Sequence, residues 1–460
     1  MFINREEELK ALNEKLNSNK FEFVVIYGRR RIGKTKLALK SVENIEHIYY
    51  LAVEGDNLKH FKRYASKVVP TIEYAKEDWE AYFNFLILND KIIIIDEFPN
   101  LIKENPNILS LFQRIVDVHL KNTKTKLIIL GSSLSMMGEK VLSYKSPLYG
   151  RKTGVLKIRP LKFKHLKEFF PNATWEELVE IYGFADGIPY YLEKIELPFW
   201  RYLNEEIKRV DSFLRYEVDF LMKYEFEEPT TYKKILEAIA FGNHTLGEIK
   251  NYLGIKHSDL TPYLKNLIEV EFVEREIPIT ESPKTKKGRY YIKDNFITFY
   301  FRYIFPNLSA IEEGIFEIDE IKADYNQYLG FRSEAESNEM RSISSNVFEK
   351  VAKEFLIELN KMNKLPFKFL NIGRWWKKGE EIDLIALNKN EKKALFVEVK
   401  WKNLNNKEVK KILNNLERKS ELVGLSDYEI YYAIIGKEIK NKENLKDYLV
   451  FDLEDFNKLL

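Results

Sequence analysis

Two glycines, a lysine and a threonine lie within residues 28–35 at a spacing that suits phosphate binding. The segment fits the P-loop pattern G-x-x-x-x-G-K-[ST] at every position, between a strand-like run and a helix-like run. In chain order its residues are Gly28, Arg29, Arg30, Arg31, Ile32, Gly33, Lys34 and Thr35. Glycines let backbone N–H groups surround phosphates, and a helix N-terminus adds positive potential. We expect Lys34 to contact the β- and γ-phosphates of a nucleotide and Thr35 to bind Mg²⁺.

Two acids follow the apolar run at residues 92–95, which is typical of a buried strand. Asp96 and Glu97 would therefore lie at the carboxyl end of that strand, where α/β sheets bind ligands. Beside a P-loop, we expect Asp96 to hold Mg²⁺, usually through water. Glu97 would then be a catalytic residue that polarises the attacking water. The alternative is an ordinary strand that ends in solvated acids.

Three more side chains are candidates for sensing the γ-phosphate. Ser132 and Ser133 follow the strand-like residues 127–130, and the sequence does not distinguish between them. A cap for the following helix is an equal alternative for both serines. Arg151 follows Gly150, and it could stabilise transition-state charge in its own subunit or across a subunit interface. A surface arginine is the equal alternative there.

A second group of chemically useful residues lies at 380–401. Glu398 and Lys400 are two apart in a strand-like run and so share one face, and Asp383 is expected on the adjacent strand of a hairpin that turns at 388–391. The two carboxylates would hold Mg²⁺ or Mn²⁺ for metal-assisted phosphodiester cleavage. Lys400 would orient the water or stabilise the developing charge, and Glu349 could be a further metal ligand. A chance ion-pair face, or an intact fold that has lost activity, are the alternatives.

Basic residues near this group suggest a nucleic-acid surface. One cluster is Lys284, Lys286, Lys287 and Arg289, and the other is Arg374, Trp375, Trp376, Lys377 and Lys378. The first could contact phosphates and the second could stack on or guide a strand. For the second cluster, a tryptophan pair that packs a hairpin between solvated lysines is an even alternative. The helix at 258–269 carries little positive charge, so base reading by it is doubtful, and protein–protein or interdomain contact is an even alternative for this region.

The elements that must position these residues follow from hydrophobic periodicity. Short apolar runs separated by amphipathic stretches predict an α/β fold with a buried parallel sheet and helices on both faces. The expected strands are 23–27, 48–53, 91–98, 126–131 and 155–158. Residues 230–300 suggest three helices and a two-stranded wing, which is a winged-helix pattern. The last part of the chain suggests a separate α/β unit.

These patterns divide the 460 residues into five segments. They are a P-loop core at 1–160, a helical lid at 161–228, a winged helix at 229–307, a connector at 308–342 and a C-terminal unit at 343–460. The chain has no cysteine, which excludes disulfides, zinc–thiolate sites and cysteine nucleophiles. Its formal charge of +3 gives no global attraction for nucleic acid. With no apolar leader and no membrane-length apolar run, we expect a cytoplasmic protein without a membrane partner.

Several motifs occur together in an order that resembles a known family. They are FINREEEL, the P-loop, IIIIDE, LIILGSS, SPLYGRKTG, GIPYYL and YYIKDNF. Over about the first 300 residues the chain resembles the archaeal ATPase family of the AAA-like and STAND P-loop NTPases. The resemblance implies ATP as ligand, a segment at Arg5 and Glu6 near the adenine, a nucleotide-responsive lid at Gly187–Pro189 and a winged helix. Homo-oligomers occur among related ATPases, so one is possible here.

The C-terminal pattern resembles the PD-(D/E)xK nuclease superfamily. The match is D-x14-E-x-K, with Ile382 in place of the proline and helices on both sides. Together the two resemblances imply an ATP-hydrolysing protein coupled to a metal-dependent nuclease that acts on nucleic acid, with DNA favoured. The alternative is a regulatory or signalling NTPase that binds DNA or a protein without cleavage.

Overall fold

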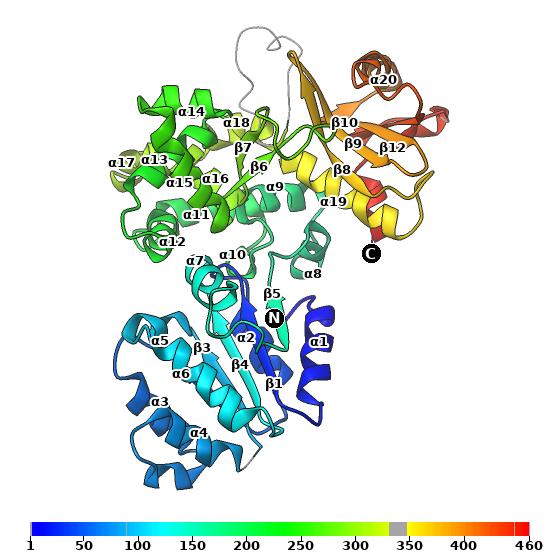
Figure 1. Cartoon of the computed structure of the whole chain (residues 1–460). Coiled ribbons are helices and arrows are strands. Elements are labelled where there is room, and N and C mark those ends of the chain that lie inside the picture. The colour runs from blue at the N-terminus through cyan, green and yellow to red at the C-terminus, as the bar shows by residue number, and fades with distance from the viewer. Residues whose placement is uncertain (1, 89, 331–346, 446, 460) are drawn as a thin grey trace. The chain divides into compact units, whose positions relative to one another are not determined.

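The computed structural model describes residues 2–88, 90–330, 347–445 and 447–459 (Figure 1). Its contacts divide the chain into two compact units. The first unit contains Met1–Pro160 with the short segments Ile188–Tyr190 and Tyr224–Glu227. The second unit contains Leu161–Gly187, Tyr191–Lys223 and Glu228–Leu460. The chain thus returns twice to the first unit after leaving it.

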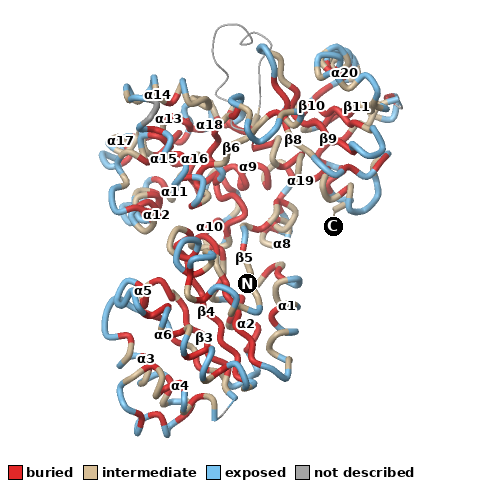
Figure 2. Tube along the Cα trace, in the orientation of Figure 1, coloured by how far each residue is buried: buried red, intermediate tan, exposed pale blue. Residues whose placement is uncertain are grey.

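The first unit is built on a five-stranded sheet in the order β2-β3-β4-β1-β5. All four pairings between its strands are parallel, which confirms the predicted parallel sheet. Its strands are β1 Glu22–Tyr27, β2 His47–Leu51, β3 Ile92–Asp96, β4 Lys126–Gly131 and β5 Gly154–Lys157. Every residue of β3 and β4 is buried, because helices cover both faces, and this explains their continuous apolar runs (Figure 2).

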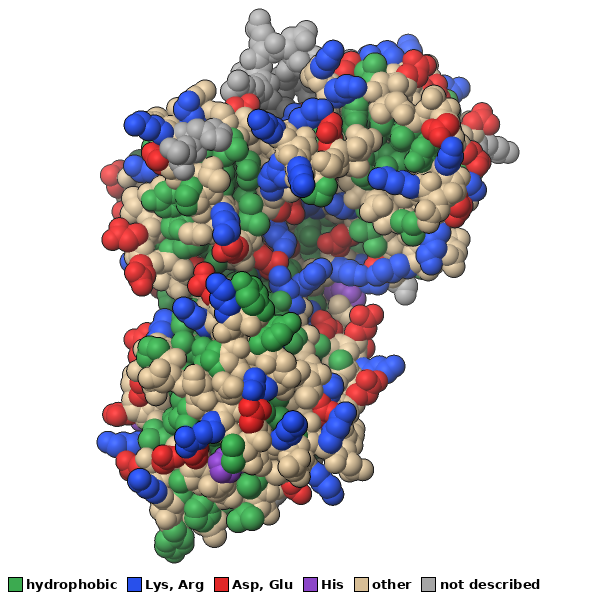
Figure 3. Space-filling view, viewed as in Figure 1, with side chains coloured by type: hydrophobic (Ala, Val, Ile, Leu, Met, Phe, Trp, Pro, Cys, Tyr) green, Lys and Arg blue, Asp and Glu red, His purple; other side chains and the backbone are tan. Residues whose placement is uncertain are grey.

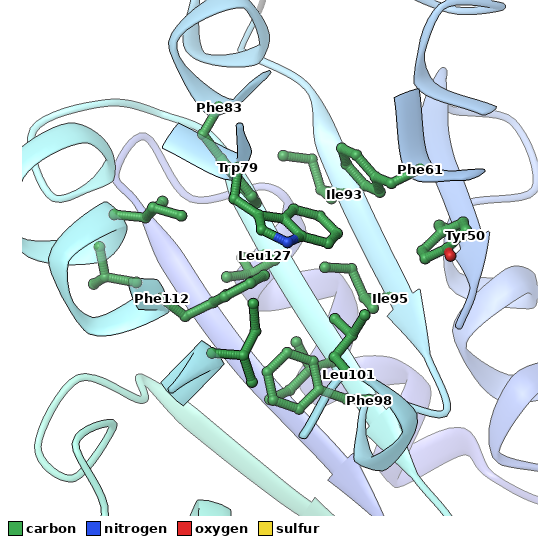
Figure 4. Close-up of a cluster of buried hydrophobic side chains, with 14 of the residues drawn as sticks. Tyr50, Phe61, Trp79, Phe83, Ile93, Ile95, Phe98, Leu101, Phe112 and Leu127 are labelled. Atoms are coloured by element: carbon green, nitrogen blue, oxygen red, sulfur yellow. The ribbon is translucent and has the colours of Figure 1, made fainter. Parts of the chain in front are cut away.

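Aromatic side chains from the helices of this unit fix the position of β3. Trp79 and Phe83 of α4 (Trp79–Ile87) and Phe112 of α6 (Ile108–Arg114) pack beside Ile93 and Ile95 (Figure 4). The rings of Phe83 and Phe112 meet edge to face with centroids 5.6 Å apart. The remaining helices are α1 Glu6–Leu16, α2 Lys34–Ser41, α3 Asn57–Ala65, α5 Pro99–Glu104 and α7 Leu134–Met136. This packing holds the end of β3, where Asp96 lies, in one place.

The second unit begins with helices and contains the segment expected to be a winged helix. Its first helices are α8 Leu166–Phe169, α9 Trp175–Ala185, α10 Pro189–Leu192, α11 Phe199–Lys208 and α12 Glu217–Glu225. Three further helices precede an antiparallel hairpin: α13 Thr230–Ala240, α14 Leu246–Leu253, α15 His257–Glu269, β6 Val273–Glu276 and β7 Arg289–Ile292. This is the element order expected from the sequence, and the winged-helix interpretation stays a prediction.

The expected connector contains helices as well as undescribed residues. The helices α16 Asn295–Phe299, α17 Leu308–Glu312 and α18 Asp319–Leu329 follow the hairpin. Tyr325 and Tyr328 of α18 donate hydrogen bonds to the carbonyls of Glu180 and Gly183 in α9. The acidic stretch at 331–346 lies outside the described residues. The end of the described connector, α18, is therefore a helix packed against α9.

A mixed five-stranded sheet, in the order β12-β11-β10-β9-β8, forms the last part of the second unit. Its strands are β8 Asn371–Lys377, β9 Glu380–Asn388, β10 Lys393–Leu404, β11 Glu429–Ile439 and β12 Leu449–Phe451. β8, β9 and β10 are antiparallel neighbours, whereas β11 and β12 continue the sheet in parallel with β10. The helices α19 Val347–Lys361 and α20 Asn406–Glu421 pack against it. The expected hairpin of β9 and β10 is present.

Within the described part of the chain, none of the helices combines the length and the apolar character that crossing a bilayer requires.

A buried carboxylate joins α19 to the start of the second unit. Glu354 accepts hydrogen bonds from the backbone N–H of Phe163 at 2.7 Å and from the Tyr182 hydroxyl at 3.3 Å. Burial raises the pKa of Glu354 to about 7; the bond from Phe163 and the charge of Lys162 lower it, and the charge of Asp186 raises it. The ordinary pKa of 4.5 applies once the chain unfolds.

This raised pKa predicts a loss of stability with rising pH. Folded Glu354 keeps its proton up to about pH 7, so its contribution is full below about pH 4.5 and is lost as the pH passes through about 7. The loss should be about 3 kcal/mol. Glu354→Gln keeps an oxygen acceptor and has no charge to bury, so its urea midpoint should fall less between pH 5 and pH 8 than that of the wild type. Identical pH profiles would contradict this assignment.

Candidate functional site

The P-loop connects β1 to α2 through a backbone that only particular residues allow. Gly28 has φ 151°, and a Cβ there would lie 2.4 Å from the carbonyl oxygen of Ile158. Gly33 has φ 87°, and Arg31 also adopts a positive φ, of 73°. A loop of this kind turns tightly from strand to helix, so that backbone donors can face an anion. The two motif glycines are therefore required by the conformation as well as by the pattern.

Lys34 is buried at the first position of α2. Its ammonium group donates a hydrogen bond to the carbonyl oxygen of Arg29, 2.8 Å away within the same loop. Burial lowers the pKa of Lys34 to about 8, although the charges of Glu97 and Asp96 oppose this effect. A phosphate beside this lysine would favour its charged form. The geometry therefore suits an anionic ligand that replaces the Arg29 carbonyl as the partner of Lys34.

Asp96 lies at the end of β3 and joins the P-loop to the neighbouring strand. Its Oδ2 accepts hydrogen bonds from the Thr35 hydroxyl at 2.6 Å and the Tyr49 hydroxyl at 3.0 Å. Its Oδ1 accepts from the backbone N–H of Glu97 at 2.8 Å. Hydroxyl and carboxylate oxygens are the ligands that Mg²⁺ prefers, so Thr35 and Asp96 fit this ion by their chemistry. The structure brings these two predicted metal ligands together.

Both carboxylate oxygens of Glu97 are held by side chains. The Ser132 hydroxyl donates to Oε1 at 2.7 Å, and the Tyr224 hydroxyl donates to Oε2 at 2.8 Å. Glu97 itself has φ 50°, a left-handed conformation that costs energy for a residue with a side chain. Burial raises the pKa of Tyr224, and the negative charge of Glu97 raises it further. Tyr224 thus remains a neutral donor to Glu97.

The two segments that return to the first unit both contact the P-loop arginines. The guanidinium of Arg31 lies over the ring of Tyr190, 3.8 Å from its centroid. That of Arg30 lies 4.1 Å from the ring centroid of Tyr224. These cation–π contacts place residues from two later parts of the chain directly on the phosphate-binding loop.

The next residue of the second returning segment, Glu225, contacts the loop after β4. Its buried carboxylate accepts hydrogen bonds from the backbone N–H groups of Leu134 and Ser135 and from the hydroxyls of Ser133 and Ser135. Burial raises the pKa of Glu225 in spite of these donors. The segment Tyr224–Glu225 therefore contacts three parts of the candidate site at once: the P-loop, Glu97 and the loop after β4.

The structure distinguishes the sensor candidates by position. Ser132 contacts Glu97, whereas the Ser133 hydroxyl caps α7 by accepting from Met136. Arg151 lies away from these residues: it donates to both carboxylate oxygens of Asp117 at 3.0 Å and to the carbonyls of Pro147 and Tyr149. Within one subunit, Arg151 therefore has the contacts expected of a surface arginine, which is the second of its two alternatives.

Arg5 lies at the edge of the P-loop, in the segment that the family resemblance places near the adenine. Its guanidinium donates to the carbonyl oxygen of Arg159 at 2.7 Å and to that of Ile32 at 3.4 Å. It also pairs with Glu8 at 3.2 Å. Arg5 therefore links the N-terminal segment to the loop and to the end of the sheet.

The C-terminal residues expected to act together also converge. Asp383 of β9 accepts hydrogen bonds from the backbone N–H of Val399 at 2.8 Å and from Lys400 at 3.2 Å. Lys400 also donates to Glu398 at 2.6 Å. Burial raises the pKa of Glu398, the nearby charge of Asp383 raises it further, and Lys400 and Lys419 lower it. Two buried carboxylates in contact are an oxygen donor set that suits a hard divalent cation.

Lys419 is an unexpected member of this group. From the last turn of α20 it donates to Glu398 at 2.9 Å and to the carbonyl of Glu381 at 2.8 Å. Glu349, by contrast, pairs with Arg374 at 3.1 Å. Among the described residues, no three acidic or histidine side chains converge closely enough to hold a metal ion, so Glu349 does not supply the expected further ligand.

Of the two even alternatives for the tryptophan pair, the structure has the one in which both rings pack. Trp375 is buried in the core of the C-terminal sheet. Trp376 is also buried: its indole N–H donates to the carbonyl of Lys287 at 3.2 Å, and Arg289 covers its ring. Arg374 is enclosed by acids and by the Tyr291 hydroxyl. Of this cluster only Lys377 and Lys378 are exposed.

Sequence reasoning missed four residues of these sites: Tyr49, Tyr224, Glu225 and Lys419. Tyr49 could have been found, because β2 pairs in parallel with β3 and so ends beside Asp96. Lys419 follows the buried positions of α20, including Leu413 and Leu416, which point toward the sheet. Tyr224 and Glu225 carry no local signal, because their contacts depend on a long-range return of the chain.

Comparisons with known proteins agree with this architecture. Residues 2–195 match a family described as an ATPase domain predominantly from Archaea. Residues 333–412 match a family of archaeal and bacterial proteins of unknown function. An uncharacterized protein of Methanocaldococcus jannaschii is 84% identical over 457 residues, which cover 99% of this chain and 100% of that protein.

Two further relatives share smaller parts. An uncharacterized ATP-binding protein of M. jannaschii is 54% identical over 44 residues, or 10% of this chain and 75% of that protein. A Walker-type ATPase of Pyrococcus abyssi has a similar structure, with a TM-score of 0.52 and 21% identity over 65% of this chain and 96% of its own. This last similarity concerns the fold.

Lys34 and Lys36 provide a matched test of the P-loop site. Lys34 is buried in the loop, whereas Lys36 is exposed on the same helix. Lys34→Ala should weaken ATP binding about 100-fold, because it removes a charge-assisted contact of about 2.7 kcal/mol. Lys36→Ala should bind like the wild type in calorimetric titrations. Equal affinities of wild type and Lys34→Ala would show that ATP does not bind here.

Proposed function

We propose that this chain, which belongs to the same family as the M. jannaschii relative and carries an archaeal ATPase domain, hydrolyses ATP and couples this to a metal-dependent nuclease site. The observation that carries the first half is the contact of Thr35 with Asp96 beside a buried Lys34. The observation that carries the second half is the convergence of Asp383, Glu398 and Lys400. The two sites would lie in different units of the chain.

In the ATPase reaction, each residue has a distinct role. Lys34 would leave the Arg29 carbonyl and bind the β- and γ-phosphates. Mg²⁺, held through Thr35 and Asp96, would neutralise charge on the phosphates. Glu97 would accept a proton from the attacking water. The water oxygen would form a bond to the γ-phosphorus while the bond from that phosphorus to the ADP oxygen breaks. Ser132 holds one oxygen of Glu97 and would orient this base.

The second oxygen of Glu97 gives the site a means of control. Tyr224 occupies Oε2, so the base has no oxygen free of a protein donor for water. The Tyr224 segment is continuous with helix α12, most of which belongs to the second unit. A ligand at the γ-phosphate position would compete for Arg30 and disturb its contact with Tyr224. We therefore propose that this segment transmits the nucleotide state along the chain.

At the C-terminal site, Asp383 and Glu398 would hold a divalent metal that neutralises charge on the scissile phosphate. Hydrolysis would form a bond from a water oxygen to phosphorus and break one phosphodiester P–O bond. The proton from water would leave to solvent, and the departing oxygen would be protonated. Lys400 contacts both acids and would stabilise the charge that develops on the phosphate oxygens.

A regulatory NTPase that binds nucleic acid or protein without cleavage is the second candidate. One observation favours it: Glu398 is engaged by both Lys400 and Lys419, so a metal would have to displace ammonium groups. In this case the acids and lysines would be a buried ion-pair network that stabilises the sheet.

The contact between Tyr224 and Glu97 predicts a hyperactive variant. Tyr224→Phe removes the donor to Oε2 and leaves that oxygen of the base free to accept from water. ATP turnover should rise about tenfold, equivalent to about 1.4 kcal/mol in the barrier. Tyr216→Phe, at an exposed tyrosine, is the control and should turn over ATP at the wild-type rate. A kcat of Tyr224→Phe at or below the wild-type value would refute the proposed restraint.

The nuclease half is tested by cleavage of plasmid, single-stranded DNA, branched DNA and RNA with Mg²⁺ or Mn²⁺, with and without ATP. Asp383→Asn should abolish cleavage and leave ATP hydrolysis intact, because the two sites are separate. Asp427→Asn changes an exposed acid of the same unit that pairs with Lys392, and it should cleave like the wild type. Failure of the wild type to cut any of these substrates would favour the regulatory NTPase.

A further inference from the structure

The two basic segments expected to contact nucleic acid form one pocket in the second unit. A hollow of about 890 Å³ lies between the start of α14, the connection from β6 to β7 and the turn from β8 to β9. Six cationic side chains line it: Arg275, Lys286, Lys287, Arg289, Lys377 and Lys378. No carboxylate is among the described residues that line the pocket. Lys and Arg side chains gather on this part of the visible face (Figure 3).

Two arginines form a fixed wall of the pocket. Arg289 pairs with Glu381 and covers the ring of Trp376, with its guanidinium carbon 4.7 Å from the centroid. Arg275 donates to the carbonyl oxygens of Pro283 and Thr285 in the connection between the strands. A Cβ at Gly288 would lie 2.3 Å from the Arg275 guanidinium, so a side chain there would require this guanidinium to shift. Both cations are thus held in place before any ligand binds.

Three exposed lysines complete the pocket. They are Lys286 of the first connection and Lys377 and Lys378 of the β8–β9 turn. Within the described ranges of the chain, no carboxylate lies within ion-pair distance of these three ammonium groups. Lysines without a structural partner can exchange counterions for phosphates, which is the main source of sequence-independent affinity for nucleic acid. These three exposed residues therefore add cations to an anion site whose two arginines already have protein partners.

One residue of β9 connects this pocket to the acid cluster. The Glu381 side chain pairs with Arg289 in the wall, and the Glu381 carbonyl accepts from Lys419 at 2.8 Å. Lys419 in turn donates to Glu398 at 2.9 Å. The wall of the pocket is therefore linked through Glu381 to the strand that supplies Asp383, and through Lys419 to Glu398. A mononucleotide needs fewer cations than three separate segments provide, and the Trp376 ring has Arg289 over it rather than an open face for a base.

We propose that this pocket binds the phosphodiester backbone of a nucleic acid and positions it beside Asp383 and Glu398. This inference rests on the proposed nuclease function for the fate of the bound strand, but the binding itself does not require cleavage. Because the contacts are with phosphates, binding should be insensitive to sequence and should weaken steeply with salt.

The test is fluorescence anisotropy with labelled DNA of scrambled sequence, performed in EDTA so that binding is measured without cleavage. The variant Lys286→Glu/Lys377→Glu/Lys378→Glu should bind at least tenfold more weakly than the wild type. Its slope of log affinity against log salt should be smaller by about 3, one for each lost phosphate contact. The control Lys234→Glu/Lys407→Glu/Lys410→Glu makes the same charge change at exposed lysines of the same unit. It should bind like the wild type, and both variants should retain ATP hydrolysis.

Three outcomes would overturn the proposal: equal weakening in both triple variants, an unchanged salt slope in the pocket variant, or displacement of DNA by millimolar inorganic phosphate at low salt. The last result would identify a small-anion site. Pocket-dependent binding by a wild type that never cleaves DNA would refute the nuclease and leave this proposal standing. Cleavage that does not depend on the pocket lysines would refute this proposal and leave the nuclease function standing.

Discussion

The hydrogen bond from Thr35 to Asp96 is the contact on which the nucleotide site depends. It joins the helix that follows β1 to the end of β3, and the two residues are 61 positions apart in the sequence. The contact exists because parallel strands end at the same edge of the sheet, and β4 lies between β1 and β3 in the strand order. The aromatic residues over β3 keep that edge in register. Tyr49 and the backbone N–H of Glu97 both donate hydrogen bonds to Asp96, and Lys34 lies next to Thr35 in the chain.

The same edge is where later parts of the chain return. Tyr190 and Tyr224 lie on the P-loop arginines, and Glu225 holds the loop after β4. Tyr190 lies in α10, and Tyr224 and Glu225 are the last two residues of α12, so each contact is made by a helix that also contains residues of the second unit. The Glu97 carboxylate is the point where the two parts meet. It accepts one hydrogen bond from Ser132, which follows β4, and one from Tyr224 of the returning segment.

Much of this could be predicted from sequence, for identifiable physical reasons. The parallel sheet followed from apolar runs that only a doubly covered strand needs, and the partners Thr35 and Asp96 followed from motif spacing. Asp383 and Glu398 came together because a short hairpin connects their strands. Trp375 and Trp376 showed the limit: a tryptophan pair beside lysines has the same composition whether it stacks on a ligand or packs a hairpin. Tyr224 and Glu225 depended on tertiary contacts that leave no local pattern.

Glu97, held between Ser132 and Tyr224, is the residue that we propose as the base of the ATPase. The most direct measurement compares ATP binding and steady-state hydrolysis in wild type and Glu97→Gln, with Mg²⁺ present. Glu97→Gln should bind ATP with wild-type affinity and lose hydrolysis by a factor of about 100 to 10,000, the range expected for general base catalysis. Hydrolysis at the wild-type rate by Glu97→Gln would contradict this role of Glu97.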